Sequence, residues 1–281
     1  MRTDFAIDSA RPQPVARHTV EAPAKAGTLR FRASWAETED EVREAQRLRY
    51  RVFATEMGAR LSPPPGTQAG LDVDRFDAYC DHLLVRAVNS DEHARGKLVG
   101  TYRVLSPAGA GRAGGFYADT EFDLAPLQGL RAQAVELGRA CIDPAWRSGG
   151  VIMALWSALG GYMLAHGLDT MIGCASIGLA DGGQSAGLLW RQLRQHHLAA
   201  PQWQVRPYTP LDLGADEYIP LTVDAGRRLS DTPPLIKGYL RCGARLLGPP
   251  AFDAAFNTAD LPMMMRLTDL PARHREHFLN G

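Results

Sequence analysis

The sequence has no excess charge, because 31 lysines and arginines balance 31 aspartates and glutamates among its 281 residues. A neutral chain has no overall attraction to nucleic acid or to an anionic membrane, so any basic site must be local. The first 27 residues also lack the apolar run of a secretory signal or a membrane span. They are rich in alanine, proline and arginine, and we expect residues 1–27 to form a disordered tail on a cytoplasmic protein that binds no nucleic acid.

Cysteine is scarce and irregularly spaced. The four cysteines form neither a C-x-x-C pair nor the spacing of a zinc site, and they are Cys80, Cys141, Cys174 and Cys242. We expect reduced, mostly buried thiols and no bound metal. No serine or cysteine stands in the context of a nucleophile elbow, so a covalent intermediate on a side chain is not expected.

The apolar residues recur with periods that alternate between strand and helix, which predicts one α/β domain over residues 28–281 built on a single mixed sheet. The expected strands are residues 28–35, 82–88, 97–105, 135–141, 169–176 and 261–267. The expected helices are residues 41–57, 151–164, 184–197 and 234–243, with a closing helix from Asp269. Loops are expected at residues 59–70 and 106–115, and residues 201–281 form a less periodic C-terminal part.

The most informative segment is the predicted strand, turn and helix over residues 135–155. The turn Arg147-Ser148-Gly149-Gly150 precedes an apolar helix, and its small residues leave backbone N–H groups open. Such groups at a helix start favour a phosphate, as does the helix dipole. Phosphopantetheine on coenzyme A or acyl carrier protein supplies one, so the turn predicts an acyl-donor site. The alternative is a tight turn with close helix packing.

Glu136 and Arg139 form a second constellation on the predicted strand. Residues three apart point to opposite faces of a regular strand, but Gly138 between them favours a bulge that re-aims one side chain. A bulge also frees backbone N–H groups that can stabilise the oxyanion of a tetrahedral intermediate. Glu136 is then a candidate general base. The alternative is a salt bridge at the end of the strand.

Arg49 lies on the apolar face of the first predicted helix, where an unpaired charge is costly. It therefore pairs with an acid or binds a ligand, and the nearest acids are Asp72, Asp74 and Asp77. Their spacing does not fit an EF-hand calcium loop. The acidic loop either forms salt bridges with the arginine-rich helix or recognises the ammonium group of a substrate.

The order of these motifs resembles the acyl-homoserine-lactone synthase branch of the GNAT fold. The matching residues are Arg49 with Phe53, Asp74 with Asp77, Gly100 with Arg103, and Glu136 with Arg139. Those synthases usually carry a tryptophan where this chain has Ala59. The stretch PPLIKGYLRCGARLLGPPAFDAAFNTADLPMMM, together with DPAWRSGGVIMALW, is similar to the bacterial L-ornithine N-alpha-acyltransferases.

The resemblance implies a three-layer GNAT-like α/β fold with a mixed, mostly antiparallel central sheet, and residues 201–281 become a family-specific extension. It implies transfer of a 3-hydroxy fatty acyl group from acyl carrier protein to the alpha-amine of ornithine, giving lyso-ornithine lipid. The co-substrate is then an acyl thioester on phosphopantetheine, without a tightly bound cofactor. Acyl carrier protein is the expected partner, and release of the lipid product implies peripheral contact with the inner membrane.

The resemblance also assigns residue roles. Glu136 is the expected general base. Substrate binding is expected of Arg49, Phe53, Asp74, Asp77 and Arg103, with Arg49 ordering the acidic loop. Donor binding is expected of Gly138, Arg139, Arg147, Ser148, Gly149 and Gly150.

Three alternative functions fit the sequence less well. A synthase that uses S-adenosylmethionine is disfavoured by Ala59, and an acetyltransferase that uses acetyl-coenzyme A is disfavoured by the bulky Ile152 after the turn. Some relatives carry the name hemolysin, but the chain lacks a strongly basic amphipathic helix. The sequence does not distinguish among ornithine, lysine and glutamine as the acceptor. Lys237 either meets a carboxylate or phosphate or is an ordinary exposed lysine.

Overall fold

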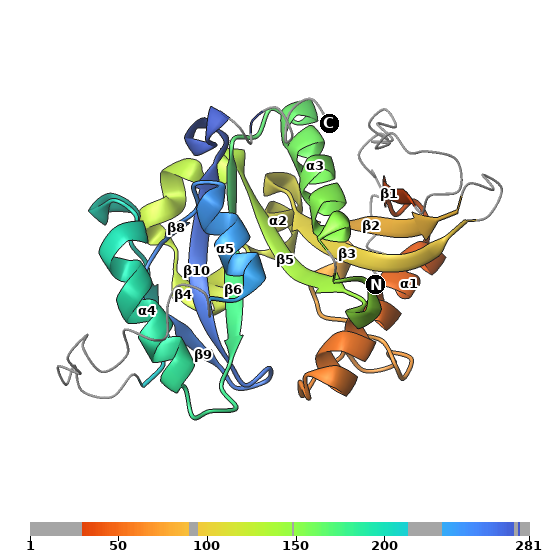
Figure 1. The fold of residues 1–281 in the computed structure, drawn as a ribbon, viewed down its shortest axis with the longest axis horizontal. Helices are drawn as coiled ribbons and strands as arrows, with labels where there is room; N and C mark the ends of the chain where they lie inside the picture. Colours follow the sequence, from red (N-terminus) through yellow and green to blue (C-terminus); the bar gives the residue numbers. More distant parts are fainter. Residues whose placement is uncertain (1–29, 90–94, 148, 213–231, 273–274, 276–281) are drawn as a thin grey trace, which may run out of the picture.

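The computed structural model describes residues 30–89, 95–147, 149–212, 232–272 and 275 (Figure 1). Its centre is an eight-stranded sheet. The strands follow the order β1 (Arg30–Trp35), β2 (Asp81–Val88), β3 (Lys97–Leu105), β5 (Ala134–Ile142), β6 (Thr170–Gly178), β10 (Thr258–Arg266) and β8 (Arg245–Leu246), with β9 (Ala251–Asp253) also paired to β10. Every neighbouring pair is antiparallel except β5 and β6, which run parallel. The expected mixed, mostly antiparallel sheet is therefore confirmed.

A separate two-stranded sheet pairs β4 (Phe122–Asp123) with β7 (Arg206–Pro207). The long strands lie where sequence periodicity predicts them, although β10 begins three residues earlier than expected.

Helices cover both faces of the sheet, which gives the expected three layers. The front face, nearest the viewer in Figure 1, carries α3 (Gly150–Ala165), α4 (Gln184–His197) and α5 (Pro234–Arg241). The back face carries α1 (Glu39–Tyr50) and α2 (Pro107–Ala113). Strand alternation separates the two cores, since Leu83 and Val85 of β2 pack with α3 while Leu84 between them packs with α1.

Helix α1 begins as the sequence predicts. The Thr38 side chain accepts a hydrogen bond from the Glu41 backbone N–H, and the Glu41 carboxylate accepts one from the Thr38 backbone N–H, which completes a capping box. The regular α-helix ends at Tyr50 and continues as a π-helical segment, Arg51–Glu56, with Met57 as the C-cap, so the helix ends where the sequence predicts but changes its hydrogen-bond pattern in the last turns. Gly58, with φ +75°, ends it as expected.

The prediction of a flexible loop at residues 106–115 is wrong, because this segment contains α2. The many glycines and alanines of the segment suggest a loop, but residues that cap a helix stand at both of its ends. The Ser106 hydroxyl accepts a hydrogen bond from the Gly109 N–H, Pro107 occupies the first turn, and Gly114 closes the helix in the left-handed region. The short helix packs close to the acidic loop.

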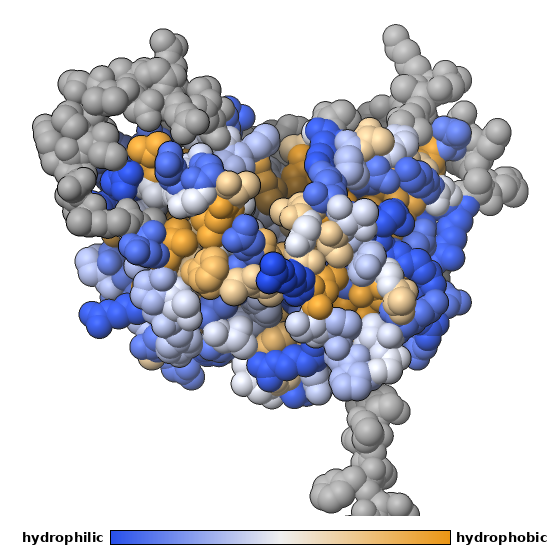
Figure 2. Space-filling model, turned by 90° about the horizontal axis from the view of Figure 1, so that it is seen from below, coloured by the Kyte–Doolittle hydropathy of each residue, from blue (hydrophilic) through white to orange (hydrophobic). Residues whose placement is uncertain are grey.

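Two sequence-based expectations concern the ends of the chain. The tail of residues 1–27 and most of the closing helix after Asp269 lie outside the described residues. Among the helices that the structure describes, none has the length and apolar character needed to cross a membrane. From below, hydrophobic side chains gather toward the middle of the surface and hydrophilic ones toward its edges (Figure 2).

Candidate functional site

The centre of the sheet opens between β5 and β6. These strands pair only over Ala134–Glu136 and Thr170–Ile172. Gly173 then allows the closest approach, because a Cβ there would lie 2.4 Å from the Leu137 carbonyl oxygen. Beyond this point β5 continues along β3 and β6 along β10, so the two strands separate. We call the opening beyond Leu137 and Gly173 the β5–β6 fork.

A bulge in β5 lies beside the fork. Gly138 pairs with Arg103 and Cys141 with Thr101, so Arg139 and Ala140 face a single residue of β3. Arg139 carries the unusual backbone angle, with φ +52°. The extra residue turns the Arg139 side chain to the back face, which it shares with Glu136. The bulge expected from Gly138 is present, with the strained position one residue later.

Glu136 is buried on the back face, with 4% of its surface exposed. Its carboxylate accepts hydrogen bonds from the backbone N–H groups of Tyr117 and Ala118, at 2.5 and 2.7 Å, in the short helix η3 (Tyr117–Thr120). Burial raises the pKa of Glu136 to about 7, because these N–H groups only partly offset the loss of water. A carboxylate with that pKa can accept a proton near neutral pH.

Six charged side chains form a network beside Glu136, which we call the arginine–aspartate network. It joins Arg49, Arg103 and Arg139 to Asp72, Asp74 and Asp77. Arg49 contacts Asp72 and Asp77, each at 2.8 Å. Arg103 lies 2.6 Å from Asp74 and 3.3 Å from Asp77. Arg139 lies 3.2 Å from Asp74 and 3.5 Å from Asp72.

Four of the six side chains of the network are buried, and Asp74 and Arg139 are partly exposed. Burial alone would raise the pKa of Asp77, but Arg49 and Arg103 hold it well below its usual range. Arg49 is 1% exposed and pairs with two loop acids, so the ion-pair interpretation of this residue is the one that the structure bears out. Asp74 and Asp77 already face arginines, and their binding of a substrate cation stays a prediction.

Aromatic rings surround Arg139 on its other sides. Its guanidinium carbon lies 4.7 Å from the centre of the Phe256 ring and 5.2 Å from that of Tyr117. Phe256 meets Phe53 edge to face, with ring centres 5.7 Å apart. Phe53 therefore reaches the site through Phe256, which sequence reasoning did not identify.

A second acidic group lies on the same back face and was also missed. Ligand atoms of Glu121, Cys174 and Asp260 lie within 4.8 Å of one another. Burial, followed by the charge of Asp260, raises the pKa of Glu121 to about 8, and burial also raises that of Asp260. Three ligand atoms at this spacing can bind a metal ion. Because the pKa values of the two carboxyl groups are raised, protons compete with a metal for their oxygens at neutral pH. The expected absence of metal stays a prediction.

This acidic group carried no sequence signal. Glu121, Cys174 and Asp260 come from three separate elements, and only the sheet register brings them together. Ile172 of β6 pairs with Glu136, and Cys174 follows two residues later on the same face. The group therefore lies along the β6 side of the fork.

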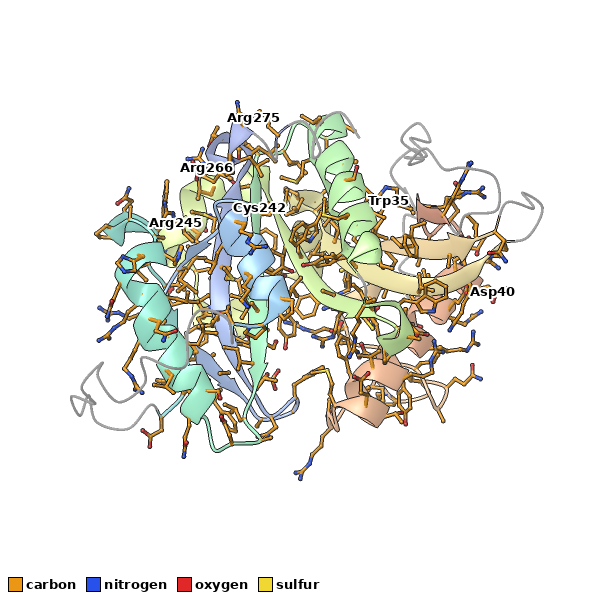
Figure 3. All side chains as sticks on the ribbon, viewed as in Figure 1. Trp35, Asp40, Cys242, Arg245, Arg266 and Arg275 are labelled. Carbon is orange, nitrogen blue, oxygen red and sulfur yellow. The ribbon has the colours of Figure 1, made fainter. Side chains whose placement is uncertain are left out.

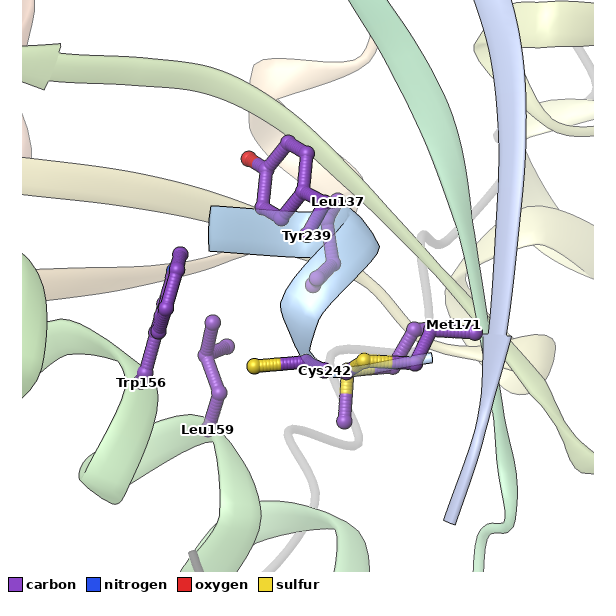
Figure 4. Close-up of a pocket in the computed structure, with 7 residues that line it drawn as sticks. Leu137, Trp156, Leu159, Met171, Tyr239 and Cys242 are labelled. Carbon is purple, nitrogen blue, oxygen red and sulfur yellow. The ribbon is translucent and has the colours of Figure 1, made fainter. Parts of the chain in front are cut away.

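The front side of the fork holds a small apolar pocket (Figure 4). It is lined by Leu137, Trp156, Leu159, Met171, Tyr239, Cys242 and Met265. Helix α5 covers this region, and Figure 3 shows Cys242 at its end, over the sheet. Gly238 lets α5 lie directly on α3, because a Cβ there would come within 2.2 Å of the Trp156 ring.

The glycine turn before α3 has the predicted geometry. Gly149 is the N-cap, with φ +94°, and no side chain caps the helix. A Cβ at Gly150 would lie 2.6 Å from the Phe31 ring, as the close-packing alternative requires. Arg147 forms a two-contact salt bridge with Glu56 at 2.7 and 2.8 Å, and Ser148 lies outside the described residues. The role of the turn in donor binding stays a prediction.

The four cysteines are free thiols, as expected. Cys141 lies on the back face under α1, and its thiol is directed to the Leu48 carbonyl oxygen at 3.8 Å. Burial raises the pKa of Cys141 to about 12. A buried, protonated thiol is a poor nucleophile.

Comparison with known proteins gives consistent results. Residues 48–157 match the acetyltransferase (GNAT) domain family. The L-ornithine N(alpha)-acyltransferase of Rhodobacter capsulatus is 35% identical over 257 residues, which cover 90% of this chain and 96% of that protein. The enzyme of the same name from Brucella abortus is 36% identical over 246 residues, or 84% of each chain.

Among solved structures, the fold matches FeeM, an N-acyl amino acid synthase from uncultured soil microbes. The TM-score is 0.50 at 12% identity, over 86% of this chain and 96% of that one. This likeness concerns the fold alone.

Proposed function

The chain belongs to the L-ornithine N(alpha)-acyltransferase family and is an acyltransferase of the GNAT fold, and from this premise we propose the complete reaction. The chain transfers a 3-hydroxy fatty acyl group from acyl carrier protein to the alpha-amine of L-ornithine. The products are lyso-ornithine lipid and the free thiol of the carrier. One observation carries the proposal: Glu136, buried with a pKa near 7, lies where β5 and β6 separate, between a charged back face and an apolar front face.

Proton transfer is the task of Glu136. An amine attacks a thioester only in its neutral form, so a proton must leave the ornithine ammonium first. Each oxygen of the Glu136 carboxylate accepts one backbone N–H and keeps further acceptor capacity, which can serve the amine directly or through a water. The nitrogen then forms a bond to the carbonyl carbon, the carbon–sulfur bond breaks, and the thiolate leaves with a proton.

The fork provides a place for the thioester. Beyond Glu136 the β6-facing edge of β5 has no ladder partner in β6. Backbone N–H groups on such an edge can donate to the thioester carbonyl and to the oxyanion that develops from it. The bulge at Arg139 also distorts the opposite edge, where two residues face one residue of β3.

The acceptor is proposed to bind on the back face. Ornithine carries two amino groups, and the family name independently points to this cationic acceptor. Glu121 and Asp260 are carboxylates with raised pKa values, and a cation beside them would favour their ionised forms. Asp74 and Asp77 are less suited to that task, because the arginines of the network already neutralise them.

The donor is proposed to enter along the fork with its phosphate at the start of α3. The Gly149–Gly150 turn leaves the first N–H groups of a 16-residue helix without a side-chain cap. The fatty chain then points to the front face, where Leu137, Trp156 and Met171 form an apolar wall. Arg147 can reach the phosphate only by leaving Glu56.

The proposal is tested with the purified chain, a long-chain 3-hydroxyacyl thioester of acyl carrier protein, and L-ornithine. We expect acyl-ornithine by mass spectrometry, with fragmentation placing the acyl group on the alpha-amine. Parallel reactions replace ornithine with lysine, glutamine or S-adenosylmethionine, and the carrier with coenzyme A. No product with ornithine, or a faster reaction with S-adenosylmethionine, would contradict the proposal.

A further inference from the structure

Glu121 and Asp260 form a carboxyl pair that lacks a counter-ion. Asp260 is 4% exposed, and an oxygen of each carboxyl group lies within 4.8 Å of the other. Among the residues that the structure describes, neither acid forms a salt bridge with a lysine or an arginine. The groups recorded as hydrogen-bonding the pair are all neutral, namely the Cys174 thiol and the hydroxyls of Tyr117, Ser176 and Thr258. Two adjacent carboxyl groups of this kind can share a cation that comes from outside the chain.

Arg139 faces the same space from another side. Its guanidinium lies over the ring of Tyr117, and the Tyr117 hydroxyl hydrogen-bonds Glu121. Burial raises the pKa of Asp260, and the charge of Arg139 lowers it. Within the described part of the chain, however, Arg139 forms salt bridges only with acids of the arginine–aspartate network, and its buried Nε has no hydrogen-bond partner. A cation and two acids that face one space without pairing suit a ligand that carries both charges.

The spacing from Glu136 to the carboxyl pair matches the spacing of the two amino groups of ornithine. Ile172 of β6 pairs with Glu136, and Cys174, which contacts Glu121, lies about 7 Å further along this strand. Helix η3 gives a similar length, because its Ala118 N–H binds Glu136 and its C-cap is Glu121, about 6 Å further along. Five single bonds of about 1.5 Å join the two nitrogens of ornithine, which are about 6 Å apart when the chain is extended.

The space beside the carboxyl pair reaches solvent. Glu121 and Cys174 are half-buried, and Ser176, which pairs with Asp260 across the two strands, is exposed. Residues 137–140 of β5, along the fork, are also partly exposed. In Figure 1, β5 leaves β6 here toward the right of the view. A small amino acid can therefore approach the pair from the surface.

We propose that this space holds the acceptor lengthwise and selects ornithine by the charge and the length of its side chain. The inference rests on the proposed function and names the specificity device of that same site. Glu121 and Asp260 bind the side-chain ammonium, Arg139 binds the alpha-carboxylate, and the alpha-amine then lies at Glu136. Lysine is one methylene longer and glutamine carries no charge, so both fit less well.

The experiment measures kcat/KM for a series of acceptors at a fixed concentration of the 3-hydroxyacyl donor. Norvaline has the carbon chain of ornithine without the side-chain amine, and we expect the unaltered chain to prefer ornithine to it by about 100-fold or more. Lysine should be used about tenfold less well than ornithine. This comparison needs no substitution, so a folding defect cannot produce its result.

Glu121→Gln and Asp260→Asn remove one charge each at nearly constant shape. Each should lower kcat/KM for ornithine by about tenfold or more, mainly through KM, and leave kcat/KM for norvaline equal or higher. Asp123→Asn is the matched control, since Asp123 is an exposed acid two residues after Glu121 that accepts the Ala125 N–H. It should leave both acceptors unchanged. Thermal unfolding of each variant shows that it is folded.

The outcomes distinguish the two proposals. If the unaltered chain makes no acyl-ornithine, the proposed function fails. If it makes acyl-ornithine but uses norvaline equally well, the proposed function stands and the inference about the carboxyl pair is overturned. The same holds if the Glu121 and Asp260 variants keep the full preference or lower both acceptors equally. Loss of the preference on addition of EDTA would also overturn it, because the pair would then hold a metal ion.

Discussion

Glu136 has two tasks, and both use the same carboxylate. Its oxygens hold the backbone of Tyr117 and Ala118, and its protonation state is proposed to control attack on the thioester. A substitution that removes the charge also disturbs this short segment, since an amide nitrogen cannot accept the second N–H. A test of catalysis at this residue therefore needs a partner variant that disturbs the segment alone.

Glu136→Gln is expected to lower kcat/KM by at least about 100-fold, because loss of a general base has this order of effect. Asp119→Asn is the partner variant. Asp119 accepts the Phe116 N–H at 2.7 Å and pairs with Arg131, so it holds the same turn, and its charge makes only the smallest of the named contributions to the raised pKa of Glu136. If both variants lose activity to the same extent, Glu136 is a positioning residue for the turn.

The pKa of Glu136 predicts a pH profile. Burial raises this pKa to about 7, and only the ionised carboxylate can accept a proton. The value of kcat/KM should therefore fall by about tenfold per pH unit as the pH drops below about 7. Above that pH, the contribution of Glu136 to kcat/KM should no longer change with pH. Steady-state kcat/KM across this range provides the measurement. A profile without a step near 7 would contradict the assignment.

Arg49 is expected to dominate the stability of the back layer. Arg49→Ala leaves Asp72 and Asp77 without one of their cations, and breaking a buried pair of this kind costs about 3–5 kcal/mol of unfolding free energy. Arg43, whose partners Glu39 and Asp40 are exposed, is the control on the same helix, and Arg43→Ala should cost less than about 1 kcal/mol. Chemical denaturation measures both, and equal losses would contradict the role assigned to Arg49.

Among the elements, α5 has an unusually direct contact with the rest of the front layer. Gly238 allows it, because any Cβ there would overlap the Trp156 ring. Gly238→Ala should displace α5 from the pocket and lower kcat/KM for long-chain donors by about tenfold or more. Gly161→Ala on α3, where a Cβ meets nothing within 4 Å, should instead stabilise the fold by about 0.5–1 kcal/mol.

Activity and melting temperature of both variants check this prediction. Unchanged kinetics in Gly238→Ala would show that the donor does not depend on the position of α5.

Sequence patterns predicted the elements whose signals are local. The capping box at Thr38 and the apolar periods of the long strands are local, and they were located closely. Glycines gave a mixed signal: the bulge near Gly138 was expected, whereas the glycines in residues 106–115 hid the caps of α2. The π-helical end of the first helix also has no pattern in the sequence that we could identify.

The site was predictable where its residues belong to a known motif. Arg49, Asp74, Asp77, Arg103, Glu136 and Arg139 lie together as the motif order predicts. Glu121 and Asp260 were missed, because their proximity follows from strand register between distant segments. No spacing along the chain reports such contacts.

For the whole molecule, the proposed function places the two substrates on opposite faces of the sheet. The charged back face is the proposed acceptor side, the apolar pocket lies on the front face, and the fork lies between them. Burial keeps the Cys141 thiol protonated, so we do not expect a covalent acyl-enzyme on this residue. The acyl group is then transferred directly, and both substrates must be bound at the same time. We expect intersecting double-reciprocal plots when both substrate concentrations are varied.

Cys141→Ser should retain most of the activity, since its thiol faces α1 and not the fork. Intact-protein mass after incubation with donor alone should show no added acyl group. Parallel double-reciprocal plots or an acylated chain would contradict direct transfer.

The arginine–aspartate network limits how this protein can change over evolutionary time. Three arginines and three aspartates come from α1, the loop before β2, β3 and β5, and every one contacts at least two of opposite sign. A single neutral replacement leaves an oppositely charged partner short of one ion pair in a mostly buried region, which is costly. Descendants of this sequence can therefore drift freely on the surface of α1, but these six positions are expected to be kept or exchanged only as a group.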